Sequence, residues 1–566
     1  MCKNKPIILV METSKYMGKV IGLKLQERGF QVSVVSDLTV LLKTAREIYP
    51  SLILTDINNP HTFKQCMILR KDPLTKNIPI LFHLLHPTAK SVREAVKVGA
   101  KTIIIKPAAI DTIVARIVKH LNISESLVVP EDENKFKIDR NDSVSENMGK
   151  LLKRQSKLRA FPTVIVKALK IAQDADSSAI DLAKIVKSDS AVAGAVLKKA
   201  NSAYYGSSKA ISGIQEAITR IGFEESKKIL IGMSVVKMFD PQNHSINFTR
   251  KGFWEHSLAC GIVAALLAQK SGITNPAVAF TAGILHDIGK IIFDENVDAA
   301  FEQAVEVAAR KHKMIFETEK DIFGFSHNEL GYVFLQALNI PSLIFKAALY
   351  HNTTNLASND LNQQEIDLVR IIWFANIFVK ASGYTWAGDS ILGNSSINVD
   401  DIPPLTIEDY SSLMEQMELE IADFKKFLGF EEETENYYSE VDRSSRKIFY
   451  HNPFGPIIDV VEISMAKEGF VVQRSQDLEV SLQEACRNVH DATLLVQLDS
   501  STMNLTELAV RLADLPEDLP IICIGHRAEI RMLQDTNLQF SPVLWPLSIF
   551  GLRSALLNSM QESALA

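Results

Sequence analysis

Short apolar runs alternate with amphipathic segments through residues 5–122. The intervening segments have a helical period and are about as long as the crossover between two parallel strands requires. The apolar runs, which we expect to form strands, lie at 7–10, 32–35, 52–55, 80–82 and 102–105. This alternation predicts an α/β fold with a doubly wound parallel sheet. Ligands of such sheets bind at the carboxyl ends of the strands, where Glu12, Asp56 and Lys106 fall.

Helical periodicity replaces this alternation between residues 150 and 383. Ser178 and Asp181 have the spacing of a capping box, and Asp189 can cap the next helix. Two further helices are expected across 254–292. This region therefore predicts an all-α domain.

A second alternation of strands and helices occupies residues 446–562. The segment 27–32 near the N-terminus is closely matched by 467–472, which indicates an internal repeat of a whole domain. The expected strands lie at 448–450, 471–474, 494–498, 521–524 and 543–545. We therefore predict a second α/β domain in this region.

Polar and charged stretches mark the joins between these regions. Residues 130–134 are acidic and predict a linker, and the later stretch around 431–433 predicts a loose connector with one short helix at 410–428. The predicted segments are an α/β domain at 1–125, a linker at 126–149, an all-α domain at 150–383, an acidic connector at 384–443 and a second α/β domain at 444–566.

The composition narrows the class of protein. Among the 566 residues, 46% are hydrophobic and 23% are charged, which is ordinary for soluble globular domains. A net charge of −6 and the lack of a helix-turn-helix or zinc motif argue against a nucleic-acid partner. The five cysteines are scattered, as expected in a reducing compartment. No secretory signal is evident and the longest apolar helical stretch, 259–268, is too short to span a bilayer, so we predict a cytoplasmic protein without a membrane partner.

Adjacent His286 and Asp287 follow an apolar helical run in the all-α region, and His256 lies on the preceding helix. Two imidazoles and a carboxylate can hold a divalent cation, which lowers the pKa of bound water and promotes hydrolysis of a phosphate ester. Lys290, one helical turn beyond His286, can meet a substrate phosphate. The alternative is a buried polar network in which these side chains bond to one another and fix the helix packing.

Two motifs in the first domain suggest a family. Residues 54–60 end a strand with Asp56, and residues 99–100 are followed by Ile-Lys-Pro at 105–107. In these motifs the domain resembles a response-regulator receiver, which has a flavodoxin-like fold. The resemblance implies that Asp56 accepts a phosphoryl group from a histidine kinase and that Lys106 neutralises the phosphoryl charge.

The same resemblance assigns Glu12, with Asp56, to Mg²⁺ binding. Two positions depart from the family pattern. Met11 stands where the family has a second acid, and Leu84 stands where a Thr or Ser hydroxyl would bond to the phosphoryl group. Both changes weaken the expected effect of phosphorylation.

The C-terminal domain resembles the same fold with its chemistry removed. His451 and Asn452 replace the acid pair, and Gln497 or Asp499 falls at the acceptor position. Trp545 replaces the lysine, and an indole cannot supply a cation to a phosphoryl group. We expect this degenerate receiver-like domain to serve packing or dimerisation.

The helical domain carries a set of motifs at family-specific distances. They are Asp189, the segments 197–206, 214–218 and 221–222, the His-Asp segment 285–289 and the segment 324–327. In these motifs the domain resembles the HDOD family, a signalling offshoot of the HD-domain metal-dependent phosphohydrolases.

The resemblance implies a possible metal-ligand set. Its members and the nearby histidines are His256, His286, Asp287, His327 and His351. Asn376 stands where active HD enzymes close the shell with an Asp, and a neutral amide is the weaker ligand. The Gly-Tyr-Pro signature of cyclic-dinucleotide phosphodiesterases does not follow His351.

Together these features predict a two-component phosphorelay protein in which the receiver regulates a non-catalytic HDOD output or scaffold domain. The expected partners are a histidine kinase or other phosphodonor, a downstream signalling protein and a second copy of the chain. Mg²⁺ is expected at the receiver if Asp56 is phosphorylated, and any divalent metal in the HDOD domain would be non-catalytic. The alternative is a metal-dependent phosphohydrolase acting on a nucleotide or cyclic dinucleotide.

Overall fold

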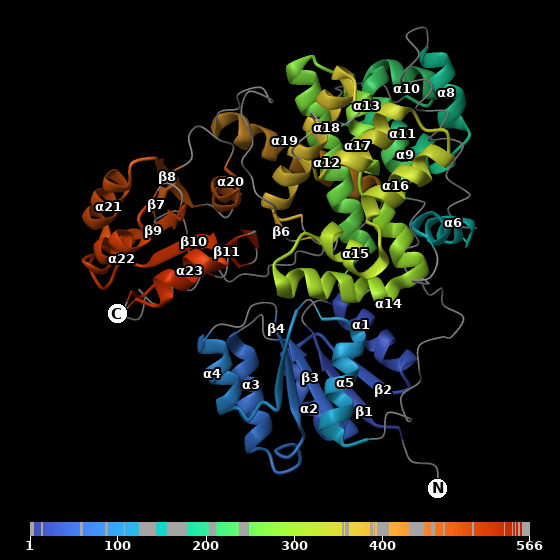
Figure 1. Cartoon of the computed structure of the whole chain (residues 1–566). Helices are drawn as coiled ribbons and strands as arrows, with labels where there is room; N and C mark the ends of the chain where they lie inside the picture. Colours follow the sequence, from blue (N-terminus) through green and yellow to red (C-terminus); the bar gives the residue numbers. More distant parts are fainter. Residues whose placement is uncertain are drawn as a thin grey trace.

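The fold is taken from a computed structural model of the whole chain (Figure 1). The structure describes residues 5–12, 15–56, 60–84, 89–106, 108–123, 143–154, 178–202, 211–236, 248–353, 356, 361–384, 389, 391–392, 407–428, 447–453, 459–467, 470–500, 503–536, 538–545, 547–548, 551–552 and 555–556.

The N-terminal domain is a five-stranded parallel sheet covered by helices on both faces. Its strands are β1 (Ile7–Met11), β2 (Gln31–Val35), β3 (Leu52–Asp56), β4 (Ile80–Leu84) and β5 (Thr102–Ile105), in the order β2-β1-β3-β4-β5. Its helices are α1 (Lys15–Glu27), α2 (Leu38–Ile48), α3 (Pro60–Lys71), α4 (Ala89–Lys97) and α5 (Ile110–Leu121). One apolar layer includes residues of α1 and α5, and the other includes residues of α2, α3 and α4. The predicted doubly wound sheet is confirmed.

The middle of the chain is helical, as predicted. Its helices are α6 (Val144–Arg154), α8 (Ala179–Lys187), α9 (Ser190–Ala200), α10 (Ile214–Ile221), α11 (Phe223–Val236), α12 (Arg250–Ser271), α13 (Pro276–Leu285), α14 (Ile288–Lys311), α15 (Ile315–Phe323), α16 (His327–Ala337), α17 (Ser342–Tyr350) and α18 (Gln363–Ala381). Ser178 and Asp181 form the expected capping box at the start of α8. The Asn201 side chain, just after α9, forms two hydrogen bonds with the backbone of Ile211. It donates to the Ile211 carbonyl oxygen and accepts from the Ile211 N–H.

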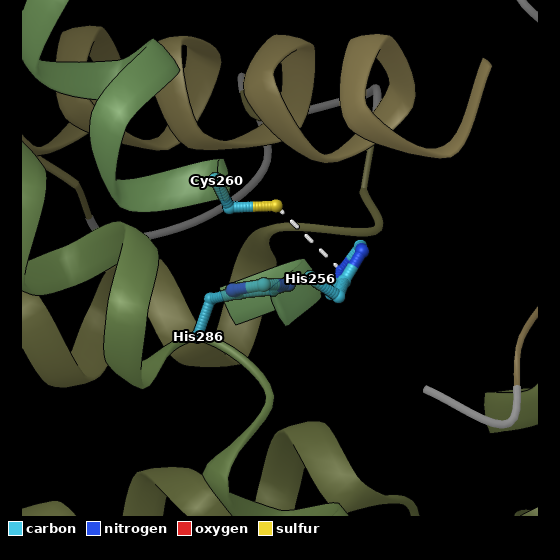
Figure 2. Close-up of side chains that lie close together, drawn as sticks. All are labelled: His256, Cys260 and His286. Atoms are coloured by element: carbon cyan, nitrogen blue, oxygen red, sulfur yellow. Dashed lines mark hydrogen bonds between the residues drawn. The ribbon is translucent and has the colours of Figure 1, made fainter. Parts of the chain in front are cut away.

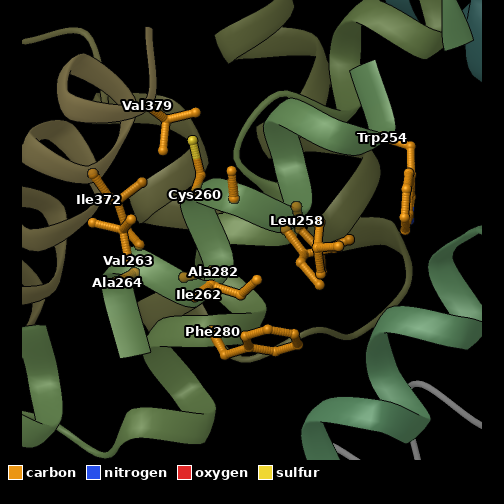
Figure 3. Close-up of a cluster of buried hydrophobic side chains, with 14 of the residues drawn as sticks. Trp254, Leu258, Cys260, Ile262, Val263, Ala264, Phe280, Ala282, Ile372 and Val379 are labelled. Carbon is orange, nitrogen blue, oxygen red and sulfur yellow. The ribbon is translucent and has the colours of Figure 1, made fainter. Parts of the chain in front are cut away.

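Helices α12 and α13 pack unusually closely, and this contact positions the candidate site. A side chain at Gly283 would meet the backbone of Cys260 and Gly261, so only glycine permits the approach. Figure 3 shows the apolar cluster that fills the remaining space around these helices, including Phe280 and Ile372. The contact brings the middle of α12 next to the end of α13.

The stretch Pro276–Lys311 is long and apolar enough to cross a bilayer, but 94% of its most apolar window is buried inside the protein. It comprises α13 and α14, which are separated at His286 and Asp287. Burial of this kind is typical of core helices.

The expected connector contains a helix, α19 (Ile407–Leu428), that packs against α11 and α12. Met417, Ile421 and Phe424 are buried in the core of the helical domain. A side chain at Gly232 would clash with the ring of Phe424, which shows how closely α19 approaches α11.

The C-terminal region forms a second five-stranded parallel sheet. Its strands are β7 (Lys447–His451), β8 (Val471–Ser475), β9 (Ala492–Gln497), β10 (Ile521–His526) and β11 (Ser541–Trp545), in the order β8-β7-β9-β10-β11. Its helices are α20 (Val460–Lys467), α21 (Leu478–Arg487), α22 (Leu505–Ala513) and α23 (Arg527–Gln534). When the strands of each sheet are numbered along the chain, both sheets have the order 2-1-3-4-5.

This second sheet is joined to the helical domain. Residues such as Leu495 and Ile522 belong to the same apolar cluster as the core of the helical domain. In addition, β6 (Ile391–Leu392) pairs antiparallel with β12 (Leu547–Ser548). The N-terminal domain instead contacts α14 through its helix α5 (Figure 1).

Candidate functional site

The ends of several helices converge on Asp287. His286 ends α13 and Asp287 begins α14, while His327 is the first residue of α16 and His351 follows α17. Figure 2 shows His256 of α12 beside His286. We call Asp287, Lys290 and these four histidines the His-Asp centre. All six side chains are almost completely buried.

Asp287 is surrounded by nitrogen atoms. One carboxylate oxygen, Oδ1, lies 3.2 Å from His327 Nε2 and 3.3 Å from His351 Nε2. The other, Oδ2, lies 3.4 Å from His286 Nε2 and 3.7 Å from His256 Nε2. The structure thus brings together the acid and all four histidines that the sequence singled out.

Each imidazole is held by its second nitrogen. The Nδ1 atoms of His256 and His286 donate to the carbonyl oxygens of Tyr384 and Gly283 at 2.9 and 2.6 Å. His351 Nδ1 donates in the same way to an α17 carbonyl, and His327 Nδ1 donates to the carboxylate of Glu319 at 2.6 Å. Bonds of this type orient metal-binding histidines in other proteins, and they leave Nε2 facing the centre.

Several donor atoms at the centre are candidates for binding a metal. His256, Cys260 and His286 offer atoms within 4.8 Å of one another, as do His286, Asp287 and His351. His286 Nε2, His327 Nε2 and Asp287 Oδ1 are all buried, and His327 Nε2 lies 3.2 Å from Asp287 Oδ1. Cys260 Sγ lies 3.6 Å from His256 Nε2, as drawn in Figure 2.

A lysine competes with a metal for the same carboxylate. Lys290 Nζ donates to Asp287 Oδ2 at 2.7 Å, and only 1% of the lysine side chain is exposed. The two residues lie three apart across the first turn of α14, which directs both inward. The ammonium therefore lies against one of the oxygens that a metal would bind.

Electrostatics keep this pair ionised. Burial would raise the pKa of Asp287, but His286 and Lys290 outweigh it and hold this pKa well below its usual range. Burial would lower the pKa of Lys290, but Asp287 outweighs it and the pKa is raised. The pair is thus a buried ion pair at neutral pH.

The pKa values of three of the histidines shift in different directions. Burial would lower the pKa of His327, but the carboxylates of Glu319 and Asp287 raise it above its usual value. Burial lowers the pKa of His256 well below its usual range and that of His351 to about 3. His351 Nε2 moreover accepts a bond from Asn352 at 2.8 Å.

Buried acidic and basic side chains surround the His-Asp centre. The acidic residues are Asp287, Glu319 and Asp389, and the basic ones are Lys290, Lys380 and His327. Lys290 already neutralises Asp287, because its Nζ lies 2.7 Å from Asp287 Oδ2. A divalent ion beside the Lys290 ammonium would bring an uncompensated charge into a buried site, which is unfavourable.

Three of these charged residues were not predicted from the sequence. Glu319 bonds to His327, and Lys380 donates to Asp389, whose charge acts on Lys290. Asn376, the expected substitute for a closing carboxylate, is buried one turn before Lys380, and its Oδ1 has no partner among the described residues. In the sequence, only the four-residue spacing of Asn376 and Lys380 indicated that Lys380 lies on the same helix face as Asn376.

The N-terminal sheet carries the second candidate site, at the carboxyl ends of its strands. Lys106 Nζ lies 2.9 Å from Glu12 Oε2 and 3.5 Å from Asp56 Oδ2. Met11 and Leu84 are buried in an apolar layer and add no donor there. Two carboxylates offer the hard oxygen ligands that Mg²⁺ prefers.

Burial governs the acid–base state of this site. Burial raises the pKa of Asp56 well above its usual value, against the opposing charge of Lys106 and with a contribution from Glu12. Burial would lower the pKa of Lys106, but the two carboxylates outweigh it and raise the pKa. Mg²⁺ bound beside Asp56 would favour its ionised form.

The corresponding edge of the C-terminal sheet lacks this chemistry. His451 pairs with Val496 as Met11 pairs with Thr55, so Gln497, rather than Asp499, occupies the place of Asp56. Gln497 accepts a bond from the Tyr450 hydroxyl at 2.6 Å. Asn452 bonds to Asp459, which caps the start of α20.

Comparison with known families agrees with this geometry. Residues 8–118 match the response regulator receiver domain, and residues 158–354 match the HDOD domain. The chain combines a receiver domain with an HDOD domain. Such a fusion indicates two-component-type signalling, and a receiver implies a phosphodonor such as a histidine kinase.

Relatives with curated sequences match parts of the chain. An uncharacterised protein of Treponema pallidum (strain Nichols) is 22% identical over 274 residues, 47% of this chain and 52% of that protein. The DNA-binding response regulator MtrA of Mycobacterium tuberculosis (strain ATCC 25618 / H37Rv) is 29% identical over 112 residues, 19% of this chain and 48% of that protein. The hybrid signal transduction histidine kinase D of Dictyostelium discoideum is 30% identical over 132 residues, 23% of this chain and 8% of the kinase. The chain thus spans about half or less of these relatives.

Two solved structures are similar to parts of the chain. An HDOD domain protein from Geobacter sulfurreducens is 19% identical and covers 50% of this chain and 99% of its own, with a TM-score of 0.41. The chemotaxis protein CheY4 of Vibrio cholerae is 22% identical and covers 20% of this chain and 98% of its own, with a TM-score of 0.20.

Proposed function

We propose that the protein is a cytoplasmic signalling protein in which a receiver domain regulates a non-catalytic HDOD domain. The observation that carries this proposal is the buried Lys290 ammonium on Asp287. In a hydrolase of the HD class a metal would occupy this position and activate water. Here an ammonium of the chain itself neutralises the carboxylate, and an ammonium cannot bind and activate a hydroxide in this way.

Asp56 is the proposed point of input. A carboxylate oxygen of Asp56 forms the new O–P bond as the donor's P–N bond in phosphohistidine, or P–O bond in an acyl phosphate, breaks and the leaving group departs with the electron pair. Lys106 lies close enough to neutralise the added charge, and Glu12 and Asp56 would hold Mg²⁺. The output is a surface of the HDOD domain that meets a downstream protein.

The C-terminal domain is proposed to be a degenerate receiver used for packing. Its sheet has the strand order of the receiver, whereas Gln497 and Trp545 replace the acceptor and the lysine. One of its faces shares an apolar core with the helical domain. A second copy of the chain remains a proposed partner.

The second candidate function is a metal-dependent phosphohydrolase acting on a nucleotide or cyclic dinucleotide. The specific observation in its favour is the set of close metal-ligand atoms at the His-Asp centre, where His286, Asp287 and His351 offer atoms within 4.8 Å of one another. Displacement of Lys290 from Asp287 would complete a site of mixed nitrogen and oxygen ligands.

A hydrolysis assay separates the two functions. The wild-type chain and His286→Ala are incubated with cyclic dinucleotides and with a generic phosphodiester, each with Mn²⁺, Zn²⁺ or Mg²⁺. The proposed function predicts no turnover above that of His286→Ala under any condition. Turnover by the wild type that disappears in His286→Ala would establish the hydrolase instead.

A further inference from the structure

Helix α14 presents a row of carboxylates to the receiver. Asp298, Glu302 and Glu306 are spaced four residues apart, so they lie along one face of the helix. We call these three residues the acidic face. In Figure 1 α14 runs along the boundary between the helical domain and the receiver, next to α1 and α5.

The acidic face supplies the N-terminal cap that α5 lacks. The residue at the cap position is Ala109, which has no side chain able to accept a bond. Its backbone N–H donates instead to Glu306 Oε2 at 3.0 Å, and the N–H of Ile110 donates to Glu302 Oε2 at 3.2 Å. Carboxylates stabilise helix starts because they satisfy free N–H groups and face the positive end of the helix dipole.

Two more contacts strengthen this docking. The Thr112 hydroxyl donates to Glu306 Oε2 at 2.9 Å, and Lys24 of α1 donates to Asp298 Oδ2 at 3.3 Å. Glu302 is only 2% exposed, so the receiver keeps water away from its carboxylate. Separation of the two domains would expose this acid and leave the first turn of α5 without its cap.

The two segments of α14, which meet at a kink at Val297, link the two candidate sites. At its N-terminal end α14 carries Lys290 and follows Asp287 directly. At the receiver, Lys106 contacts Asp56 and is followed within three residues by the capped Ala109. The phosphoacceptor and the His-Asp centre are thus connected through α5 and α14.

We propose that the acidic face of α14 holds the receiver as long as Asp56 is unmodified and releases it when Asp56 is phosphorylated. The proposal rests on the proposed function, because it needs Asp56 to be the acceptor. A phosphoryl group carries close to two negative charges, about one more than the carboxylate it replaces. It draws Lys106 away from Glu12 and adds negative charge near the positive end of α5, where it opposes Glu302 and Glu306.

Hydrogen exchange of the full-length chain tests this docking. Mass spectrometry would follow peptides that cover Ala109–Thr112 and the acidic face, before and after incubation with acetyl phosphate and Mg²⁺. We expect exchange at the start of α5 to become roughly fivefold faster or more after phosphorylation, as loss of a helix cap predicts. Asp56→Asn should show no change.

A double variant tests the contact without phosphorylation. Glu302→Ala with Glu306→Ala should give the fast exchange at α5 in untreated protein. The control, Asp321→Ala, removes an exposed acid of the same domain that pairs with Lys313, and should leave α5 protected. Unchanged protection in the double variant would overturn the docking contact.

Mass measurement of the Asp56 peptide distinguishes the possible failures. Phosphate on Asp56 with unchanged exchange at α5 would overturn the release and leave the proposed function standing. No phosphate on Asp56 would overturn the trigger together with that part of the proposed function.

Discussion

Lys290 Nζ lies 2.7 Å from a carboxylate oxygen of Asp287, and both side chains are buried at the point where α13 ends and α14 begins. The proposed non-catalytic role of the HDOD domain depends on this ion pair. A buried carboxylate needs a counterion, and a metal or a lysine can provide it. The chain provides the lysine three residues downstream, within one turn of the same helix.

Replacement of Lys290 is expected to destabilise the protein strongly. Lys290→Met leaves Asp287 buried without its closest cation, which costs about 3–5 kcal/mol when one partner of a buried pair is removed. The matched control is Lys184→Ala, which breaks another lysine–aspartate pair three residues apart, but on the surface. Exposed pairs contribute about 0–1 kcal/mol. Urea unfolding compares the two variants, and equal losses would contradict a counterion role for Lys290.

Labelling by a small phosphodonor should depend on Asp56 and on Mg²⁺. Wild-type protein incubated with acetyl phosphate is expected to gain one phosphoryl group, detected by intact mass, and Asp56→Asn is expected to gain none. Met11→Asp should increase the affinity for Mg²⁺, because it adds an oxygen ligand beside Glu12. A label that survives in Asp56→Asn would place the acceptor elsewhere.

Asp294 should make stability fall as pH rises. This residue of α14 accepts a hydrogen bond from Arg250 of α12. Burial nevertheless raises the pKa of Asp294 to about 7. The folded chain therefore keeps this proton up to about pH 7, while an unfolded aspartate releases it near pH 3.9. Between these values the folded state binds more protons, so the slope of stability against pH is negative, by up to roughly 1.4 kcal/mol per pH unit. Asp294→Asn should reduce this slope, and Asp321→Asn should not.

The C-terminal domain is expected to unfold together with the helical domain. Leu495 lies in the shared apolar core and is fully buried, so Leu495→Ala should cost about 2–5 kcal/mol and lower the transition of both domains. The control, Val510→Ala, changes an apolar side chain that is 60% exposed. Calorimetry that shows an unchanged helical-domain transition in Leu495→Ala would mean that the C-terminal domain is only tethered.

The sheets were predictable because their strands are short apolar runs with helices between them. The expected strand 52–55 is β3, which extends by one residue to include Asp56. The close approach of α12 to α13 could not be inferred in the same way, because it depends on Gly261 and Gly283 meeting across two helices. The packing of α19 on the helical domain was likewise not visible, since the acidic residues around it predicted a connector.

The candidate sites were predictable in part. Adjacent His286 and Asp287 identified one centre, and Asp56 with Lys106 identified the other. Glu319, Lys380 and Asp389 were missed because each acts on the centre through a contact distant in sequence. The sequence left two roles open for Lys290, a phosphate contact or a member of a buried polar network, and in the structure its ammonium is bonded to Asp287.

Metal titration tests most directly whether Lys290 replaces a metal at the His-Asp centre. Isothermal titration with Mn²⁺ is carried out on Asp56→Asn, so that the receiver site does not contribute, and on the same protein with Lys290→Met added. The account predicts no stoichiometric site in the protein that retains Lys290, and one new site when Lys290 is removed. A tight site with one Mn²⁺ per chain in the protein that retains Lys290 would contradict it.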